Sequence, residues 1–518
     1  MAPRSTHSLS RARVDALVSA VTATSGDTSE LHTPLDGQRI AGIPQSSIDD
    51  VDDAFERART AQQTWSGSNT ADRAAILLRL HDLVLDRQAE LLDLIQLESG
   101  KSRTHAFDEI AHVALTARYY ARRLHKLIGR ESRLGALPGL TSVWVHRVPK
   151  GVVGLISPWN YPLTMAISDG IAAVAAGNAV VHKPDSQTPL TALAGVELLR
   201  RAGLPEDVWT VVTGPGAQIG TAIVDRADYV SFTGSTETGA GIARRLSDRL
   251  VGSSLELGGK NPMIVLPGAD VERAAAGAVD ACFSSAGQLC VSVERLYVHD
   301  SIYTRFRDAF VRRIRALKIA TGLDWRADIG SLVSAAQLEK TMKHVDNALA
   351  NGASVAVGGN ARPDLGPYVY EPTVLENVTA AADCFAEETF GPVVSLYRYS
   401  TPAEVITLAN AGDYGLNASI WGPTRHAREV AGAITAGTVN INEGFAASFA
   451  SIDAPMGGMR QSGMGRRQAD EGLWRYTESQ TVAVQRLMPM AGFGRLTHRG
   501  NARMLTAGLR LLRRTPRA

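Results

Sequence analysis

Apolar residues recur at helical spacing through the first part of the chain. Between Ile48 and about Lys126 they lie three and four positions apart, with charged residues between them. This period predicts a series of amphipathic helices. Residues 1 to about 45 are rich in serine and threonine and show little periodicity, so we expect an irregular arm there.

From Gly151 onward, continuous apolar runs of strand length alternate with helical segments. This pattern predicts a parallel sheet that is covered by helices on both faces. The rhythm restarts at 263–266 and persists to about residue 440, which predicts a second α/β domain. Shorter alternating segments at 143–147 and 477–485 predict extended structure outside these two domains. The strands expected in the first domain are 152–156, 179–182, 208–212 and 229–232, with helices over 162–176, 190–202 and 238–250.

Length and composition fit a soluble globular protein of several domains. The chain has 518 residues, of which 45% are hydrophobic and 20% charged, so about three domains are expected at ~150 residues each. Lysine and arginine number 54 against 52 acidic residues, a net charge of +2. This balance gives no strong field for nucleic acid, and we expect no nucleic-acid partner.

Compartment follows from the apolar runs and the cysteines. The longest apolar run, 170–181, is far shorter than the ~20 residues that a membrane span needs, and the polar N-terminus has no secretory signal pattern. Three cysteines, Cys282, Cys290 and Cys384, are too few for a disulfide framework in a chain of this length. We therefore expect a cytoplasmic protein.

Polar and glycine-containing turns follow three of the predicted strands. They are 157–160, 183–186 and 233–235, and the carboxyl ends of parallel strands are where such sheets bind ligands. Gly234-Ser235 precedes a helix and can offer backbone N–H groups to phosphate. The usual G-x-G-x-x-G fingerprint is missing. A lysine after the second strand, at Lys183, favours phosphate over a bare ribose diol.

Two residues are candidates for covalent and acid–base chemistry. Cys290 follows a polar turn that contains Gly287, which suits a reactive thiolate, whereas Cys282 is expected in the core. Glu256 lies at the apolar, glycine-bordered junction of the two α/β domains, where a raised pKa would suit a general base. A helix cap or a linker salt bridge is the alternative for Glu256. No motif has the spacing of metal ligands.

Seven motifs in order resemble those of the aldehyde dehydrogenase superfamily, over roughly residues 35–488. They are Pro158-Trp159-Asn160, Lys183-Pro184, Phe232-Thr233-Gly234-Ser235, Glu256-Leu257-Gly258-Gly259-Lys260, Gly287-Gln288-Leu289-Cys290, Glu387-Glu388-Thr389-Phe390-Gly391-Pro392, and Pro455-Met456-Gly457-Gly458-Met459 with Ser462-Gly463.

The resemblance implies a mechanism. Cys290 would be the nucleophile, Asn160 would help to form the oxyanion hole with the backbone N–H of Cys290, and Glu256 would activate water for hydrolysis of a thioester. NADP or NAD would be the cofactor, with NADP favoured because Ser186 stands where many NAD enzymes have glutamate. The residues implied to contact the cofactor are Ile156, Trp159, Asn160, Lys183, Pro184, Asp185, Ser186, Gly216, Gly234, Ser235, Leu257, Glu388 and Phe390, with Gln337 and Lys340 as further contacts.

The resemblance also implies a domain division. The fold class is α/β, with a Rossmann-variant cofactor domain (1–127 and 149–257), an α/β catalytic domain (258–473) and a small oligomerisation sheet (128–148 and 474–488). A homodimer or homotetramer is expected. The remaining residues, 489–518, form a basic tail with leucines at helical spacing, for which packing on the protein or fraying is favoured over contact with a membrane.

Within the superfamily, the motifs are most similar to those of bacterial succinate-semialdehyde dehydrogenases. Members of that group commonly hold the substrate carboxylate with two arginines, and Ser168 and Ser284 occupy those positions here. Another aliphatic or aromatic aldehyde is therefore the alternative substrate. A CoA-acylating enzyme, an esterase and a non-catalytic protein of this fold are rival hypotheses, which the presence of both Glu256 and Cys290 and of the cofactor motifs disfavours.

Overall fold

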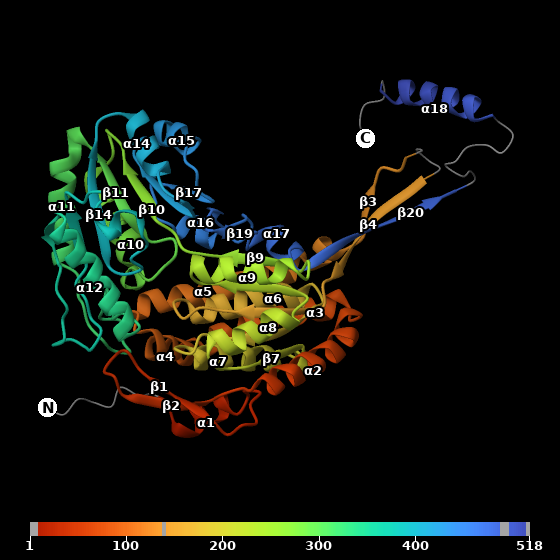
Figure 1. Cartoon of the computed structure of the whole chain (residues 1–518), viewed down its shortest axis with the longest axis horizontal. Coiled ribbons are helices and arrows are strands. Elements are labelled where there is room, and N and C mark those ends of the chain that lie inside the picture. Colours follow the sequence, from red (N-terminus) through yellow and green to blue (C-terminus); the bar gives the residue numbers. More distant parts are fainter. Residues whose placement is uncertain (1–8, 137–140, 487–496, 514–518) are drawn as a thin grey trace.

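A computed structural model describes residues 9–136, 141–486 and 497–513 (Figure 1). The predicted helical region consists of four helices, α2 (Ile48–Ser66), α3 (Thr70–Asp86), α4 (Gln88–Ser99) and α5 (Arg103–Ile128). Ser47 and Asp50 form a reciprocal capping box at the start of α2, which satisfies backbone N–H groups that the helix itself leaves free.

The first α/β domain contains a six-stranded sheet in the order β19-β9-β8-β5-β6-β7. Its strands are β5 (Val152–Ile156), β6 (Ala179–Lys183), β7 (Trp209–Val211), β8 (Tyr229–Thr233), β9 (Gly252–Glu256) and the antiparallel edge strand β19 (Gly463–Met464). The four strands expected from the sequence are present. The sequence GSSLE of β9 lacks an apolar run, and it is a strand because it pairs with β8.

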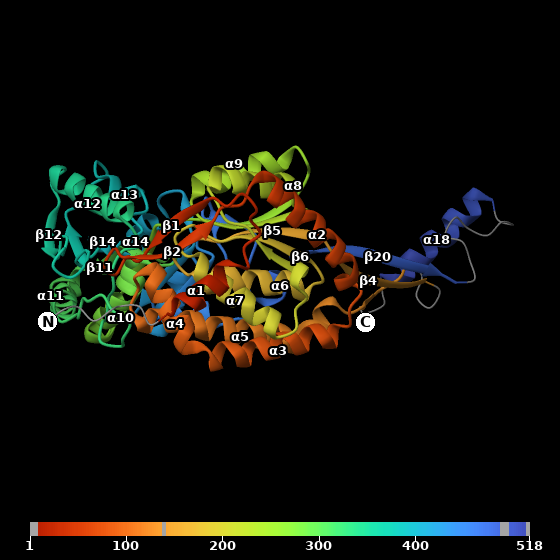
Figure 2. The same ribbon diagram turned by 90° about the horizontal axis from the view of Figure 1, so that it is seen from below.

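Helices cover both faces of this sheet, as predicted (Figure 2). Residues of α2, α8 (Thr221–Arg226) and α9 (Thr236–Ser247) pack with one set of strand side chains. The other face packs against α3, α5 and two further helices, α6 (Asp169–Ala175) and α7 (Pro189–Arg201). Burial on both sides explains why these strands are apolar throughout.

The second α/β domain contains a seven-stranded sheet in the order β12-β13-β14-β11-β10-β16-β17. Its strands are β10 (Asn261–Val265), β11 (Val293–His299), β12 (Ser354–Val357), β13 (Thr373–Glu376), β14 (Val393–Tyr399), β16 (Asn417–Trp421) and β17 (Thr438–Ile441). Its helices include α10 (Val271–Phe283), α11 (Tyr303–Arg315), α12 (Ala335–Ala350), α14 (Pro402–Asn410) and α15 (Thr424–Ala431). The α/β fold class is thus confirmed in both halves.

A small antiparallel sheet projects away from the two α/β domains (Figure 1). It consists of β3 (Glu131–Arg133), β4 (Thr141–Pro149) and β20 (Thr477–Gln485) in the order β20-β4-β3. β4 and β20 pair over nine residues each, from Thr141 with Gln485 to Pro149 with Thr477. Both extended segments that the sequence predicted therefore belong to the same sheet.

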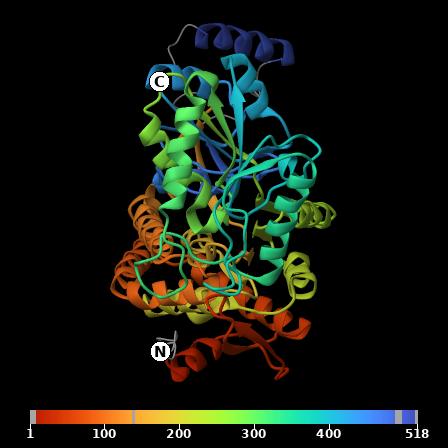
Figure 3. The same ribbon diagram turned by 90° about the vertical axis from the view of Figure 1, so that its left-hand side faces the viewer.

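The N-terminal region is not an irregular arm over its described residues. Helix α1 (Arg11–Val18) and the hairpin of β1 (Thr28–His32) and β2 (Arg39–Pro44) occupy it. Ala41 and Ile43 are buried on one side of β2, an alternation too short to stand out from its polar neighbours. The prediction was wrong because packing on the main domain, which the local pattern does not report, orders these elements. Figure 3 shows this hairpin and the C-terminal helix at opposite ends of the view.

The basic tail is described in part. Residues 487–496 and 514–518 lie outside the described residues, and α18 (His498–Leu512) lies between them. Met504, Leu505 and Leu509 are exposed on it, so these three side chains do not pack into the described protein. Among the described residues, no helix has both the length and the apolar character that a membrane crossing demands.

Candidate active site

A cavity of about 200 Å³ lies where the ends of β5, β8 and β9 face the second domain. It brings together most of the residues that the sequence singled out. Its lining comprises Pro158, Trp159, Asn160, Met165, Thr233, Gly234, Ser235, Glu256, Leu257, Gly258, Cys290, Gln337, Lys340, Glu388 and Phe390. Met165 is the member that sequence reasoning missed, because a methionine in a small-residue helix has no polar signature.

The loop that carries Cys290 is held in an unusual backbone conformation. After α10 ends, Ser285, Ala286 and Gly287 have φ values of 52°, 56° and 72°. A Cβ on Gly287 would lie 2.1 Å from the carbonyl oxygen of Gly391, so only glycine fits there. The Gln288 side chain accepts a hydrogen bond from the Val333 N–H at 3.0 Å. These constraints hold the half-buried Cys290 against the cavity.

Asn160 is fixed from both of its ends. Its side-chain Nδ2 donates to the carbonyl oxygen of Gln288 at 3.0 Å, and its own carbonyl accepts from Lys101 Nζ at 2.6 Å. Lys101 is buried and forms an ion pair with buried Glu109 at 2.7 Å. The Asn160 amide therefore contacts the residue that stands two positions before Cys290 in the chain. The bond to Gln288 uses one of the two N–H groups of this amide.

Glu256 is the last residue of β9 rather than part of a linker between the domains. Gly234 N–H donates to its backbone carbonyl, while its side-chain Oε1 is buried with no hydrogen-bond partner among the described residues. Burial raises the pKa of Glu256 to about 7, even though Arg467 and Arg475 act in the opposite direction. A carboxyl with this pKa can accept a proton near neutral pH.

Burial also raises the pKa of the Cys290 thiol, to about 12. Glu388 and Glu256 act in the same direction, whereas Arg467 and a hydrogen bond from the Val291 N–H lower the pKa. Cys290 is half-buried, so the sulfur is partly accessible, as expected. The raised pKa means that the group is a neutral thiol and not the expected thiolate. A base or an added positive charge is needed to generate the nucleophilic form.

Glu388 and Phe390 also line the cavity. Glu388 Oε1 accepts from the Gly259 N–H at 2.8 Å, and burial raises its pKa to about 7. Phe390 has a φ of 56°, and its ring meets that of Trp159 edge to face, with centroids 5.5 Å apart. Gln337 Nε2 donates to the backbone carbonyls of Thr389 and Phe390, which anchors this loop to α12.

A second cavity, of about 460 Å³, lies at the same sheet edge. Its lining includes Ile156, Gly216, Phe232, Ile242 and Arg245. The sequence analysis did not name Arg245 as a lining residue. The sequence placed it near the end of the helix that follows Gly234 and Ser235, and this position was the available signal. Its side chain also pairs with Asp225.

Lys183, the last residue of β6, lies beside that cavity, and Ser186 follows three residues later. A Cβ on Gly220, which lines it, would lie 4.0 Å from Lys183 Cδ and 3.9 Å from Ile156 Cδ1. Lys183 Nζ donates to the Pro184 carbonyl at 3.1 Å, Ser186 is exposed, and Asp185 accepts from the Gln187 N–H at 2.9 Å. The bond to Gln187 turns the Asp185 carboxylate toward its own loop.

A third cavity, of about 370 Å³, is lined by residues of α5 and of the segment 443–450. Phe445 and Phe449 line it and belong to the apolar cluster that packs against Cys290. Its ionisable lining residues are His105, Asp108, His112, Asp280 and Glu443, and no lysine or arginine of the described residues lines it. This cavity therefore combines apolar surface with carboxyl groups.

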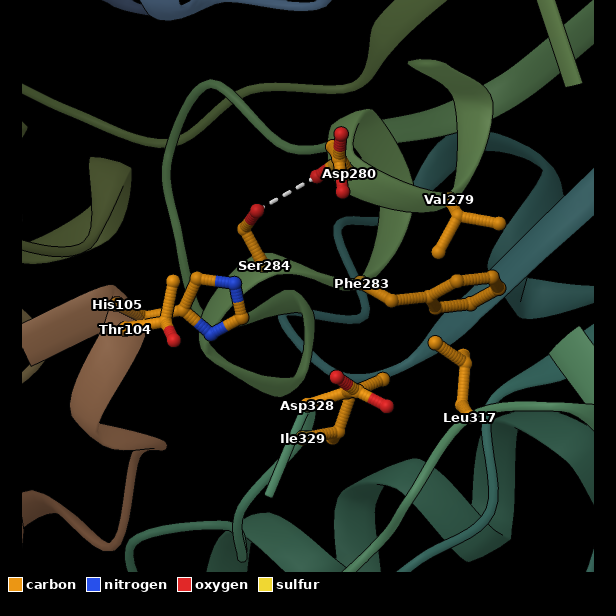
Figure 4. A pocket seen from close by; sticks show the side chains of 9 residues that line it. All are labelled: Thr104, His105, Val279, Asp280, Phe283, Ser284, Leu317, Asp328 and Ile329. Carbon is orange, nitrogen blue, oxygen red and sulfur yellow. Dashed lines mark hydrogen bonds between the residues drawn. The ribbon is translucent and has the colours of Figure 1, made fainter. Parts of the chain in front are cut away.

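Neither of the two serines that replace arginine presents a charge. Ser284 Oγ donates to the backbone carbonyl of Asp280 at 2.7 Å, as Figure 4 shows in an adjoining pocket of about 150 Å³. Ser168 Oγ lies 3.0 Å from His112 Nδ1. Burial lowers the pKa of His112 to about 3, so this ring is neutral at physiological pH.

The chain belongs to the aldehyde dehydrogenase family, which matches residues 21–482. It is therefore an enzyme that oxidises an aldehyde to a carboxylic acid. It is 49% identical over 92% of both chains to a protein of Mycolicibacterium smegmatis named "Putative succinate-semialdehyde dehydrogenase [NADP(+)]". It is 50% identical, over 87% of both chains, to a Mycobacterium tuberculosis protein named "Putative succinate-semialdehyde dehydrogenase [NADP(+)] 2".

Solved structures agree in fold. An NADP-dependent enzyme of E. coli has a TM-score of 0.86 and 34% identity, with 90% of this chain and 96% of that chain covered. An NAD⁺ complex of an aldehyde dehydrogenase from Bacillus cereus has a TM-score of 0.87 and 35% identity, with 92% and 99% covered. The resemblance seen in the sequence motifs is confirmed.

Proposed function

We propose that Cys290 is the nucleophile, Glu256 the general base and Asn160 an oxyanion donor in this aldehyde oxidation. The observation that carries this proposal is the single cavity that all three line. The Cys290 thiolate adds to the aldehyde carbon, and the Asn160 amide stabilises the oxyanion. After hydride has left the thiohemiacetal, a thioester remains on Cys290. Glu256 then takes a proton from the water that hydrolyses it.

The residues present fit a dinucleotide cofactor. The cavity of Ile156, Gly216, Phe232 and Ile242 is apolar enough for an adenine ring, and α9 begins directly after Gly234 and Ser235, so that the positive end of its dipole favours phosphate there. We infer that NADP⁺ binds here, with Lys183 and Ser186 at the adenosine ribose and Glu388 and Phe390 near the nicotinamide. When bound, this cofactor accepts the hydride.

We propose succinate semialdehyde as the first candidate substrate. The support is the name of the mycobacterial relatives, which are about half identical to this chain over most of its length. The second candidate is an uncharged aliphatic or aromatic aldehyde. The lining of the third cavity favours this alternative, since it contains Asp108, Asp280 and Glu443 but no cation to hold a substrate carboxylate.

A matched panel of aldehydes tests both candidates. We would measure kcat/KM with NADP⁺ for succinate semialdehyde, for butanal, which has the same chain length without the carboxylate, and for benzaldehyde. A preference for succinate semialdehyde over butanal supports the first candidate. A preference for butanal or benzaldehyde supports the second. The absence of NADPH formation with every aldehyde would contradict both.

We also propose that the sheet of β3, β4 and β20 is the oligomerisation sheet of a homodimer or homotetramer in the cytoplasm. Val148 and Val484 are exposed on it, each to 39%, and exposed apolar residues on a projecting sheet favour an interface. Sedimentation of the purified protein tests the assembly. Val484→Glu should reduce the mass of the particle, whereas a wild-type monomer would contradict the proposal.

A further inference from the structure

Arg467 stands out because it is a buried cation in contact with the wall of the cavity that Cys290 and Glu256 line. It is only 3% exposed. Its Nη2 forms an ion pair with Asp169 at 2.8 Å, and its Nη1 contacts Met165 Sδ at 2.8 Å. Met165 lines the cavity together with Cys290 and Glu256, so the guanidinium lies directly behind the cavity wall.

The charge of this cluster does not balance within itself. Asp169 also pairs with Arg475, at 3.0 Å, and all three side chains are at most 7% exposed. Two guanidinium groups against one carboxylate leave a net charge of +1. Burying an uncompensated charge is costly, which indicates that another anion completes the cluster.

The backbone around Arg467 is built to keep the side chain there. Arg467 and Met456 exchange backbone hydrogen bonds of 2.7 and 2.9 Å. The following residues, Gln468 and Ala469, have φ values of 62° and 49°, a left-handed conformation that costs energy for residues other than glycine. Gln468 Nε2 is held by the carbonyl of Phe449 at 2.9 Å.

We propose that Arg467 is a positioning residue whose charge stabilises the Cys290 thiolate and the Glu256 carboxylate during turnover. This inference rests on the proposed roles of Cys290 and Glu256. The charged groups that act on Cys290 are Arg467, Glu388 and Glu256. Those that act on Glu256 are Arg467, Arg475, Arg466 and Asp169. Arg467 is therefore the cation that acts on both groups. Arg475 acts on Glu256 alone of the two, so substitutions of Arg475 serve as a control for those of Arg467.

Alkylation of Cys290 by iodoacetamide at fixed pH measures the thiolate fraction directly, with the modified residue located by mass spectrometry. Removing one neighbouring opposite charge raises a pKa by about 1 unit, so Arg467→Gln should slow alkylation about tenfold. Arg467→Lys, which keeps the charge, should restore most of the rate. Arg475→Gln should leave the alkylation rate unchanged and slow thioester hydrolysis instead.

Asp169→Asn separates an electrostatic role from a structural one. It keeps both arginines and removes their shared counter-charge, so alkylation should be no slower than in the wild type. Slower alkylation in both Asp169→Asn and Arg467→Gln, or a wild-type rate in Arg467→Gln, would overturn the proposal. Circular dichroism and NADP⁺ binding show whether Arg467→Gln folds. If it does not, the alkylation rates of Arg467→Lys and Asp169→Asn test the proposal by themselves.

Alkylation needs no turnover, so failure here is distinguishable from failure of the proposed function. If Arg467 is irrelevant, the alkylation rates do not change while wild-type aldehyde oxidation persists. If Cys290 is not the nucleophile, Cys290→Ala retains aldehyde oxidation whatever the alkylation rates show.

Discussion

Lys101 donates a hydrogen bond to the carbonyl oxygen of Asn160 at 2.6 Å from a fully buried position. Glu109, its ion-pair partner, is buried as well and accepts hydrogen bonds from the backbone N–H groups of Leu163 and Thr164. This pair links α5 to the loop that carries Asn160 and the helix that follows it. The proposed oxyanion donor is thus positioned by a charge pair that lies outside the cavity.

Lys101→Met should destabilise the protein strongly. It leaves the Glu109 carboxylate buried without its counter-ion, which costs about 3–5 kcal/mol. We expect a large fall in the thermal unfolding midpoint by calorimetry. Lys343→Met is the matched control, because it breaks an exposed ion pair with Glu339 worth about 0–1 kcal/mol. Equal effects of the two substitutions would contradict this prediction.

Cys290→Ala should abolish aldehyde oxidation and leave NADP⁺ binding intact, because only the covalent step uses the thiolate. Cys384→Ala is the control, since that thiol is buried away from the cavity. Steady-state NADPH formation and a fluorescence titration of cofactor measure the two properties. Cys290→Ala removes the proposed nucleophile. Turnover by this variant above about a thousandth of the wild-type rate would therefore rule out the proposed role of Cys290.

The pKa of Glu256, raised to about 7 by burial, predicts how turnover depends on pH. The carboxylate accepts a proton only when it is ionised, so thioester hydrolysis should slow as pH falls through about 7. Glu256→Gln should give a burst of NADPH followed by a slow steady state with little dependence on pH in this range. Stopped-flow measurement of burst and steady state tests this. A steady state equal to the wild type would remove Glu256 from the mechanism.

NADP⁺ should be used at least as well as NAD⁺. Ser186 can donate to a 2′-phosphate and Lys183 supplies positive charge, a charge-assisted contact worth about 1.5–3 kcal/mol. Ser186→Glu should shift the ratio of kcat/KM values toward NAD⁺, since its carboxylate repels the phosphate. Gln187→Glu, one position further and also exposed, controls for added charge. A wild-type preference for NAD⁺ above about tenfold (~1.4 kcal/mol) would show the assignment to be wrong.

Much of the fold follows from local patterns in the sequence. The apolar runs of β5, β6 and β8 and the helical spacing of α2 to α5 are signals that each element carries by itself. β9 and the N-terminal hairpin were missed because neither carries such a local signal. Their sequences are polar or short, and pairing with β8 or packing on the main domain makes them regular.

The sequence by itself determined the family, the fold class and which residues are candidates for chemistry, because turn glycines, Cys290 and Glu256 are local features of ordered motifs. Only the tertiary structure decided their environments. Three features join segments far apart in the chain: the shared cavity of half-buried Cys290 and buried Glu256, the support of Asn160 by Lys101, and the approach of Arg467 to the cavity. Desolvation and Coulomb interactions depend on distance in space, which the order of residues does not encode locally.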